Sequence, residues 1–296
     1  MKKYLKHFIA VAVCLVLGVG LFAGCTENLG TELTAEADIT TAKTYVVESL
    51  DNTNDYEEGF QASFTVSGTM NMDSTKVKLN MDAKIASNGE KANQKTNVSM
   101  TMSSKNMEST SKMNADVNWG KVGENYVKYD KTAEQQYTFV DESEMLSNLP
   151  VVQEATTSVA FMGMMFGVDM TVLADLDFDA FDENEDISYK LYKSGDDYNL
   201  VIKTTTVEDG VKAEAEIKIL TVDEKIKSIE LNSNLFNDTR AEGASEAVWT
   251  DAGSCVMKLV ISYEFKDFSL LSANQFENFE VVDDAYEIGS MDEMPF

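Results

Sequence analysis

The chain has 296 residues, with 24 Lys and Arg against 51 Asp and Glu, and only 2 Pro. At 44% hydrophobic and 25% charged, its composition is typical of a globular protein and excludes a disordered polyanion and a multi-span membrane protein. The acidic excess argues against nucleic-acid binding, because phosphate contacts need clustered Lys and Arg. The single histidine, His7, lies in a segment that we expect to be removed. The mature chain therefore has no imidazole for general-base catalysis or metal ligation.

The N-terminus has the three parts of a secretion signal. A basic start with three lysines is followed by an uncharged run from 8 to 22 and by Ala23-Gly24, directly before Cys25. The run is shorter than the roughly 20 residues needed to cross a bilayer, so a cleaved signal over 1–24 is favoured over a permanent span. Removing this segment leaves 21 basic side chains against the same 51 acidic ones, a formal charge of −30.

The end of the signal, Leu21-Phe22-Ala23-Gly24-Cys25, resembles the lipobox of bacterial lipoproteins. In that family the cysteine thiol is acylated and becomes the first residue of the mature protein, and Leu normally stands where this chain has Phe22. The resemblance implies that the membrane is a partner through acylated Cys25, on the outer side of the cytoplasmic membrane. Each methylene buried in the bilayer adds about 0.8 kcal/mol to such an anchor. The alternative is a conventional signal peptide that leaves Cys25 as an ordinary thiol.

Cysteine usage predicts a domain without internal disulfides. Cys14 is removed with the signal, and Cys25 is expected to carry lipid, so only Cys255 remains. Cys255 lies on the apolar side of an alternating segment, which favours a buried thiol over a reactive one.

A polar, aperiodic stretch over 25–37, beginning with the lipidated cysteine, is typical of a tether. The main domain is expected over 38–282, and a loose acidic tail over 283–296. The domain begins with an amphipathic helix over 38–50, with Asp38 as its N-cap. Four apolar residues of this segment have helical spacing: Ile39, Ala42, Val46 and Leu50.

Beyond the helix, polar and apolar residues alternate, which indicates strands with one polar and one apolar face. Long strands are expected near 60–72, 77–85, 96–102 and 113–119, and shorter ones at 126–129 and 137–140. Asp73-Ser74 and Asn88-Gly89 supply turns. Helix and strands together form a first unit over 38–140.

The segment 142–176 breaks the alternation and is expected to cover the sheet as helix or loop. A second meander follows over 186–268. Its strands are expected at 187–191, 200–202, 211–219, 229–235 and 255–265, with turns at Gly195-Asp196, Asp209-Gly210 and Asp223-Glu224.

These strands fit either one sheet or two smaller sheets in succession. Strands of about 11 to 13 residues would be roughly 35 to 43 Å long at about 3.3 Å per residue, which favours one sheet. The predicted fold class is therefore mainly β (α+β), a long curved antiparallel sheet, or half-barrel, with a few helices covering its concave face.

The run Asn125-Tyr126-Val127-Lys128-Tyr129-Asp130 is similar to tyrosine-containing strands of one lipoprotein group. Together with the acylated cysteine, the first helix and the interrupted long strands, most of 38–282 resembles the LolA/LppX-like lipoprotein superfamily. The resemblance implies a half-barrel whose concave face holds acyl chains beneath helices. It also implies a role in carrying or sensing lipid.

Methionines recur on the apolar side of the predicted strands and in the covering segment. Methionine is flexible and polarisable, which suits a cavity for variable acyl chains. For any one methionine, a role in filling the core is the better explanation, whereas the stripe as a whole fits a cavity equally well. A Cu(I) site is less supported, because no histidine or spare cysteine accompanies the methionines. The residues expected to line an apolar ligand are Phe64, Val66, Met70, Met81, Met100, Met102, Met162, Met165, Phe166, Ile217 and Leu259.

The motif Asp175-x-Asp177-x-Asp179 is similar to the start of a calcium loop. Ala180 stands where the loop needs glycine and Asp186 where it needs glutamate, so a solvated acidic loop is favoured over a metal site. The sequence has no glycine-rich phosphate loop, no nucleophile elbow and no metal-type cysteine pair. We therefore expect no catalytic residue and no cofactor.

Two functions from different classes remain. The first is a membrane-anchored, non-catalytic lipoprotein that binds a lipid or other hydrophobic small molecule on the concave face of its sheet. The second is an interaction or structural lipoprotein with a packed core and an acidic exterior that contacts a protein partner or cations. They differ in whether the apolar side chains pack against one another or line a space.

Overall fold

The computed structural model describes residues 29–56, 58–72, 74–105, 107–166, 176–240, 246–263 and 281–282. Several predictions lie outside the described residues: the signal peptide, lipidated Cys25, Asp73 of the first turn, Asp175 of the acidic motif, the expected end of the last strand beyond 263, and the tail over 283–296. The side chain of Met165 is likewise not described.

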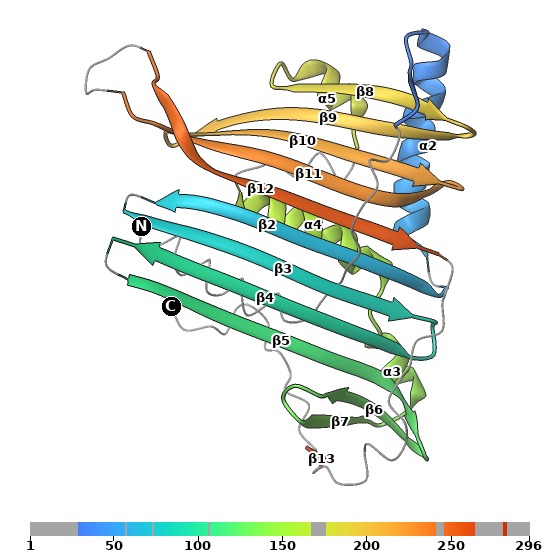
Figure 1. The fold of residues 1–296 in the computed structure, drawn as a ribbon. Helices are drawn as coiled ribbons and strands as arrows, with labels where there is room; N and C mark the ends of the chain where they lie inside the picture. Colours follow the sequence, from blue (N-terminus) through green and yellow to red (C-terminus); the bar gives the residue numbers. More distant parts are fainter. Residues whose placement is uncertain are drawn as a thin grey trace.

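The strands of the described chain form one open sheet, which confirms the predicted fold class (Figure 1). The first meander comprises β2 (Phe60–Met72), β3 (Thr75–Ser87), β4 (Ala92–Ser104), β5 (Met107–Val122), β6 (Asn125–Asp130) and β7 (Gln135–Phe139). The second comprises β8 (Ile187–Ser194), β9 (Asp197–Glu208), β10 (Val211–Val222), β11 (Lys225–Asp238) and β12 (Trp249–Ser262). These strands pair antiparallel, and the two-residue β13 (Val281–Val282) pairs parallel to β7 at one edge.

The pairing of β12 with β2 joins the two meanders. Their register brings Leu259 opposite Phe64 and Met257 opposite Val66, so the apolar sides of both meanders become one continuous face. With the two-residue β1 (Thr31–Glu32) at the other edge, the sheet order is β1-β8-β9-β10-β11-β12-β2-β3-β4-β5-β6-β7-β13. The alternative of two separate sheets is therefore wrong.

Two tight turns of the second meander have positive φ at both central residues. Asp209 and Gly210 have φ of 48° and 77°, and Asp223 and Glu224 have φ of 49° and 56°. Two consecutive residues with positive φ make the turn that matches the twist of a β-hairpin. The predicted turns at these places are confirmed.

The helices pack on one face of the sheet, which we call the inner face (Figure 1). They are α2 (Glu36–Asn54), α3 (Glu142–Ser147), α4 (Val152–Met165) and α5 (Phe178–Glu183). Helix α2 packs chiefly against β8, β9 and β11, whereas α4 packs chiefly against β2, β11 and β12. Helix α3 lies against β6 and β7, and α5 lies against β8.

Two details of the helices differ from the predictions. The N-cap of α2 is Ala35, which makes no side-chain cap hydrogen bond, so the prediction of Asp38 as N-cap is wrong. Asp38 lies in the first turn, where its negative charge is favourable near the N-terminal end of the helix dipole. Helix α5 was not predicted, because six residues are too few to show a helical period.

The predicted tether is attached to the sheet in its described part. Strand β1 (Thr31–Glu32) pairs with β8, and the Leu33 amide donates to the Leu191 carbonyl at 2.9 Å. The Asn199 side-chain amide donates to the Leu29 carbonyl, also at 2.9 Å. The free tether is therefore shorter than the predicted 25–37.

The core lies between the inner face and helices α2 and α4. Each helix contributes residues at helical spacing: Ala42, Val46 and Leu50 from α2, and Val152, Ala155, Val159 and Met162 from α4. The ring of Phe166, directly after α4, lies on Gly68 of β2, where a Cβ would come within 2.5 Å of it. Gly68 thus lets the end of α4 approach the sheet closely.

Cys255 is buried, as predicted, with 1% of its surface exposed. Burial raises the pKa of its thiol to about 12, so at pH 8 only about one thiol in ten thousand would be a thiolate, against about one in four for a free cysteine of pKa about 8.5. We expect iodoacetamide to label Cys255 at least roughly 100-fold more slowly in the native protein than in urea. Mass spectrometry of timed samples would measure both rates, and equal rates would contradict the burial of this thiol.

Candidate functional site

Most of the predicted ligand-lining residues belong to the packed core. Seven of them are at most 2% exposed and belong to a single buried cluster: Phe64, Val66, Met81, Met162, Phe166, Ile217 and Leu259. A ligand in contact with these side chains would have to displace α2 or α4. They therefore form the floor of the inner face rather than an open surface.

The other three predicted residues with described side chains, Met70, Met100 and Met102, are only partly buried. The strand register places them together at one end of the inner face, because Met70 is opposite Val77 on β3, and Val77 is opposite Met102 on β4. Met113 of β5, opposite Val98, lies on the same face and is also partly buried. We call Met70, Met100, Met102 and Met113 the methionine end.

Helix α4 packs chiefly on β11, β12 and β2, and Phe166 at its end lies on Gly68, two residues from Met70. In the described chain, no helix has its main contacts with β3, β4 or β5. Phe161 and Met164 on the outer side of α4 are 37% and 56% exposed. The methionine end is therefore an apolar surface with flexible side chains, and part of it is open to a ligand.

The opposite end of the inner face of β4 and β5 is polar and buried. Gln94 and Thr96 are each 2% exposed, and Trp119 is 5% exposed. Gln94 Nε2, Thr96 Oγ1 and Trp119 Nε1 have no hydrogen-bond partner. A buried polar atom without a partner costs about 1–3 kcal/mol, so three of them on one face are unusual. We call these three residues the donor end.

A lysine lies beside the donor end. Lys128 of β6 is opposite Trp119, and its ammonium lies 5.2 Å from the centre of the Trp119 ring. Burial lowers the pKa of Lys128, whereas the negative charges of Asp130 and Glu154 act to raise it. Burial raises the pKa of Glu154 in α4, against a backbone hydrogen bond at Val151 and the charge of Lys128. The ammonium is thus held in a partly desolvated place, where its electrostatic interactions are strengthened.

A second candidate site is an open groove of about 490 Å³ at the edge of the sheet. It lies between α2, α5 and β8, and Ile39, Phe181 and Tyr189 contribute its apolar walls, with Asp182 and Glu185 as acids. The groove is small and partly polar. The methionine end, in contrast, is formed by the apolar side chains of four methionines.

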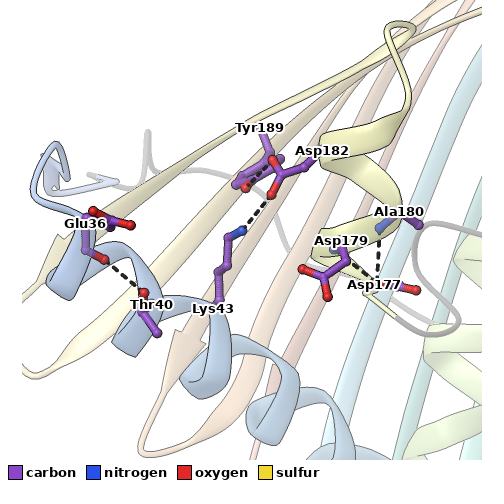
Figure 2. A network of polar contacts seen from close by, with 8 residues as sticks. All are labelled: Glu36, Thr40, Lys43, Asp177, Asp179, Ala180, Asp182 and Tyr189. Carbon is purple, nitrogen blue, oxygen red and sulfur yellow. Dashed lines mark hydrogen bonds and ion pairs between the residues drawn. The ribbon is translucent and has the colours of Figure 1, made fainter.

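A polar network beside this groove attaches α5 to α2 (Figure 2). Lys43 forms an ion pair with Asp182 at 3.0 Å, and the Tyr189 hydroxyl donates to Asp182 at 2.8 Å. Hydrogen bonds from Lys43 and then Tyr189 hold the pKa of Asp182 below its ordinary value. The Lys43 ammonium also lies 5.3 Å from the Phe178 ring centre and 5.1 Å from that of Tyr189, a cation–π arrangement.

The acidic motif has a structural role in its described part. Asp177 is the N-cap of α5, and its carboxylate accepts hydrogen bonds from the amides of Asp179 and Ala180 at 3.0 and 3.1 Å (Figure 2). Within the described ranges, no group of three or more His, Cys, Asp or Glu is placed to hold a metal ion.

Sequence analysis missed the donor end. The alternation of β4 places Ala92, Gln94, Thr96 and Val98 on one side of the strand, so two polar residues on the apolar side were the available signal. Trp119 and Lys128 gave no comparable signal. Only the register of β4, β5 and β6 brings Trp119 beside Gln94 and Lys128 beside Trp119.

Comparison with known protein families finds no model that matches this sequence, and comparison with curated proteins finds no match either. Among the described helices, none combines the length and the apolar character needed to cross a membrane.

Proposed function

We propose that this protein is an exported, membrane-anchored lipoprotein that binds a lipid or other apolar ligand at the methionine end of its inner face, without catalysis. The observation that carries the proposal is the partial exposure of Met70, Met100, Met102 and Met113 on the same face as the core. Methionine moulds itself to ligands of variable shape, and burying their apolar surface contributes about 25 cal/mol per Å². The expected lipobox at Cys25 would keep such a site next to the membrane that supplies lipid.

A pair of charge substitutions on one strand tests the proposal. Met100→Glu should weaken the binding of an apolar fluorescent probe by at least roughly tenfold, because a carboxylate next to the bound probe must lose water. Thr101→Glu is the matched control, since Thr101 is also partly buried but points to the opposite, outer face of β4. Fluorescence titration measures the affinity, and thermal unfolding followed by circular dichroism checks that both variants fold.

The proposal predicts a loss for Met100→Glu and none for Thr101→Glu. Equal affinities for the two folded variants would place the probe elsewhere. A wild-type protein that takes up no probe would favour the second candidate function, an interaction lipoprotein. The observation that favours that candidate is the edge groove, where the rings of Phe181 and Tyr189 lie with the Glu185 carboxylate and would suit a cationic side chain of a partner.

A further inference from the structure

We propose that the donor end is the headgroup site of the bound ligand, and that the ligand is a long-chain acyl compound with a carboxylate head. This inference rests on the proposed function and names the chemical class of its ligand. Its basis is the set of buried donors at Gln94, Thr96 and Trp119, which is separate from the methionine end.

The unpartnered atoms of the donor end share one hydrogen-bonding need. Gln94 Nε2 and Trp119 Nε1 only donate, and the Thr96 hydroxyl is able to donate. A carboxylate only accepts, through two oxygens with about four lone-pair sites, so it could receive hydrogen bonds from Gln94 and one neighbouring donor. A ligand head that only donates, such as an ammonium, would leave Gln94 and Trp119 unsatisfied.

The register makes Gln94 a neighbour of both Thr96 and Trp119, and it places a positive charge beside Trp119. Ala92 of β4 is opposite Trp119, which makes Gln94, two residues along β4 on the same face, a diagonal neighbour of Trp119. Lys128 is opposite Trp119 on the other side. A hydrogen bond to a charged group contributes about 1.5–3 kcal/mol, more than one between neutral groups, and the Lys128 ammonium would also attract the carboxylate. Lys128 therefore favours a carboxylate over an ester.

The donor end and the methionine end lie along the same strand, β4, on the inner face. Gln94 and Met102 are eight residues apart on β4, which corresponds to about 26 Å at about 3.3 Å per residue. An acyl chain in a membrane spans about 15 Å, half the thickness of the hydrocarbon core. A chain with its head at Gln94 would therefore lie along Thr96 and Val98 on the inner face and extend toward Met100 without reaching Met102.

Entry of the head would require movement of the segment between α3 and α4. Leu149, in this segment, is 7% exposed and packs in a cluster with Ala92, Val117 and Trp119. The cost of the unpartnered donors in the empty protein would be recovered in part when a ligand head satisfies Gln94 and one of its neighbours. The site is thus expected to reduce stability when empty and to gain it on binding.

The test compares two ligands of equal chain length, hexadecanoic acid and hexadecylamine, each below its micelle-forming concentration. The protein is the mature chain with Cys25→Ser, and native mass spectrometry and calorimetry measure stoichiometry and affinity. We expect one hexadecanoate per chain, bound at least tenfold more tightly than hexadecylamine. The methyl ester of hexadecanoic acid should fall between them, because it accepts hydrogen bonds but carries no charge for Lys128.

Variants of the donor end separate a headgroup role from a structural one. Thr96→Val removes a hydroxyl at nearly constant volume and should weaken hexadecanoate binding about fivefold, which corresponds to roughly 1 kcal/mol. The same variant should raise the melting temperature of the empty protein by about 2–4 °C, since an unpartnered buried hydroxyl is lost. Ser233→Ala is the control: Ser233 is also buried and unpartnered, but it lies on β11, four strands from β4. It should leave hexadecanoate affinity unchanged.

The outcomes distinguish this inference from the function on which it rests. If hexadecanoate and hexadecylamine bind equally well and Thr96→Val changes neither affinity, the headgroup site is wrong while an apolar binding site remains. If neither compound binds and the apolar probe does not bind either, the proposed function is wrong together with this inference.

Discussion

Replacing Gly253 by Ala should destabilise the protein by roughly 3–5 kcal/mol, a loss that few single substitutions produce. Gly253 has a φ of 147°, which residues with a side chain rarely adopt, and a Cβ would lie 2.1 Å from the Thr69 carbonyl oxygen. The clash involves the backbone of β2, so no side-chain rotation relieves it. Gly253 pairs with Met70 where β12 joins the two meanders. Its loss should therefore separate the halves of the sheet.

Two other glycines serve as controls in the same urea-unfolding measurement. At Gly120 of β5 the nearest atom to an added Cβ is 3.6 Å away, which is ordinary contact, so Gly120→Ala should change the free energy of unfolding little. Gly68→Ala should be intermediate, because its clash is with the far end of the Phe166 ring, which is able to shift. A Gly253→Ala protein as stable as Gly120→Ala would contradict the close approach of β12 to β2.

Replacing Cys25 by Ser should move the protein from the membrane fraction to the soluble, secreted fraction. The acyl chains expected at Cys25 are the only strong membrane attachment that we infer for the mature chain. Its formal charge of −30 opposes adsorption to anionic headgroups, because like charges repel within a Debye length of about 8–10 Å.

Cell fractionation measures membrane attachment, and metabolic labelling with palmitate measures acylation. Wild type should be labelled and membrane-bound, and Cys25→Ser should be neither. Cys255→Ser is the matched control, because that thiol is buried in β12 and should accept no lipid. Recovery of Cys25→Ser in the membrane fraction after a high-salt wash would show that another part of the chain binds the bilayer.

Strand positions were predicted from the sequence more accurately than any other feature. The prediction for 60–72 matches β2 at both ends, and the other long strands were found with ends displaced by a few residues. Alternation succeeds here because one face of the sheet is polar and the other is covered by helices. The polarity of each residue therefore indicates which face it occupies. The Asp209-Gly210 turn was also predicted correctly. This turn needs positive φ at both central residues, and Asp and Gly tolerate that backbone.

The ligand-lining residues were predicted less well, because alternation tells which face a residue occupies but not what covers it. Phe64 and Met100 lie on the same face, yet Phe64 is fully buried and Met100 only partly. The difference depends on α4, which packs on β2 but not chiefly on β4. The direction in which a helix crosses a sheet is set by packing between residues distant in sequence.

The sequence by itself determined the strands, their turns and the buried thiol, because each depends on neighbouring residues, and it predicts a lipid anchor at Cys25. Only the tertiary structure decided that β12 pairs with β2 to make one sheet, and that β1 attaches the end of the tether to β8. It also decided which polar residues meet: Gln94, Trp119 and Lys128 come from three strands and become neighbours only through their register. Long-range pairing depends on contacts between distant segments, and no local pattern encodes those contacts.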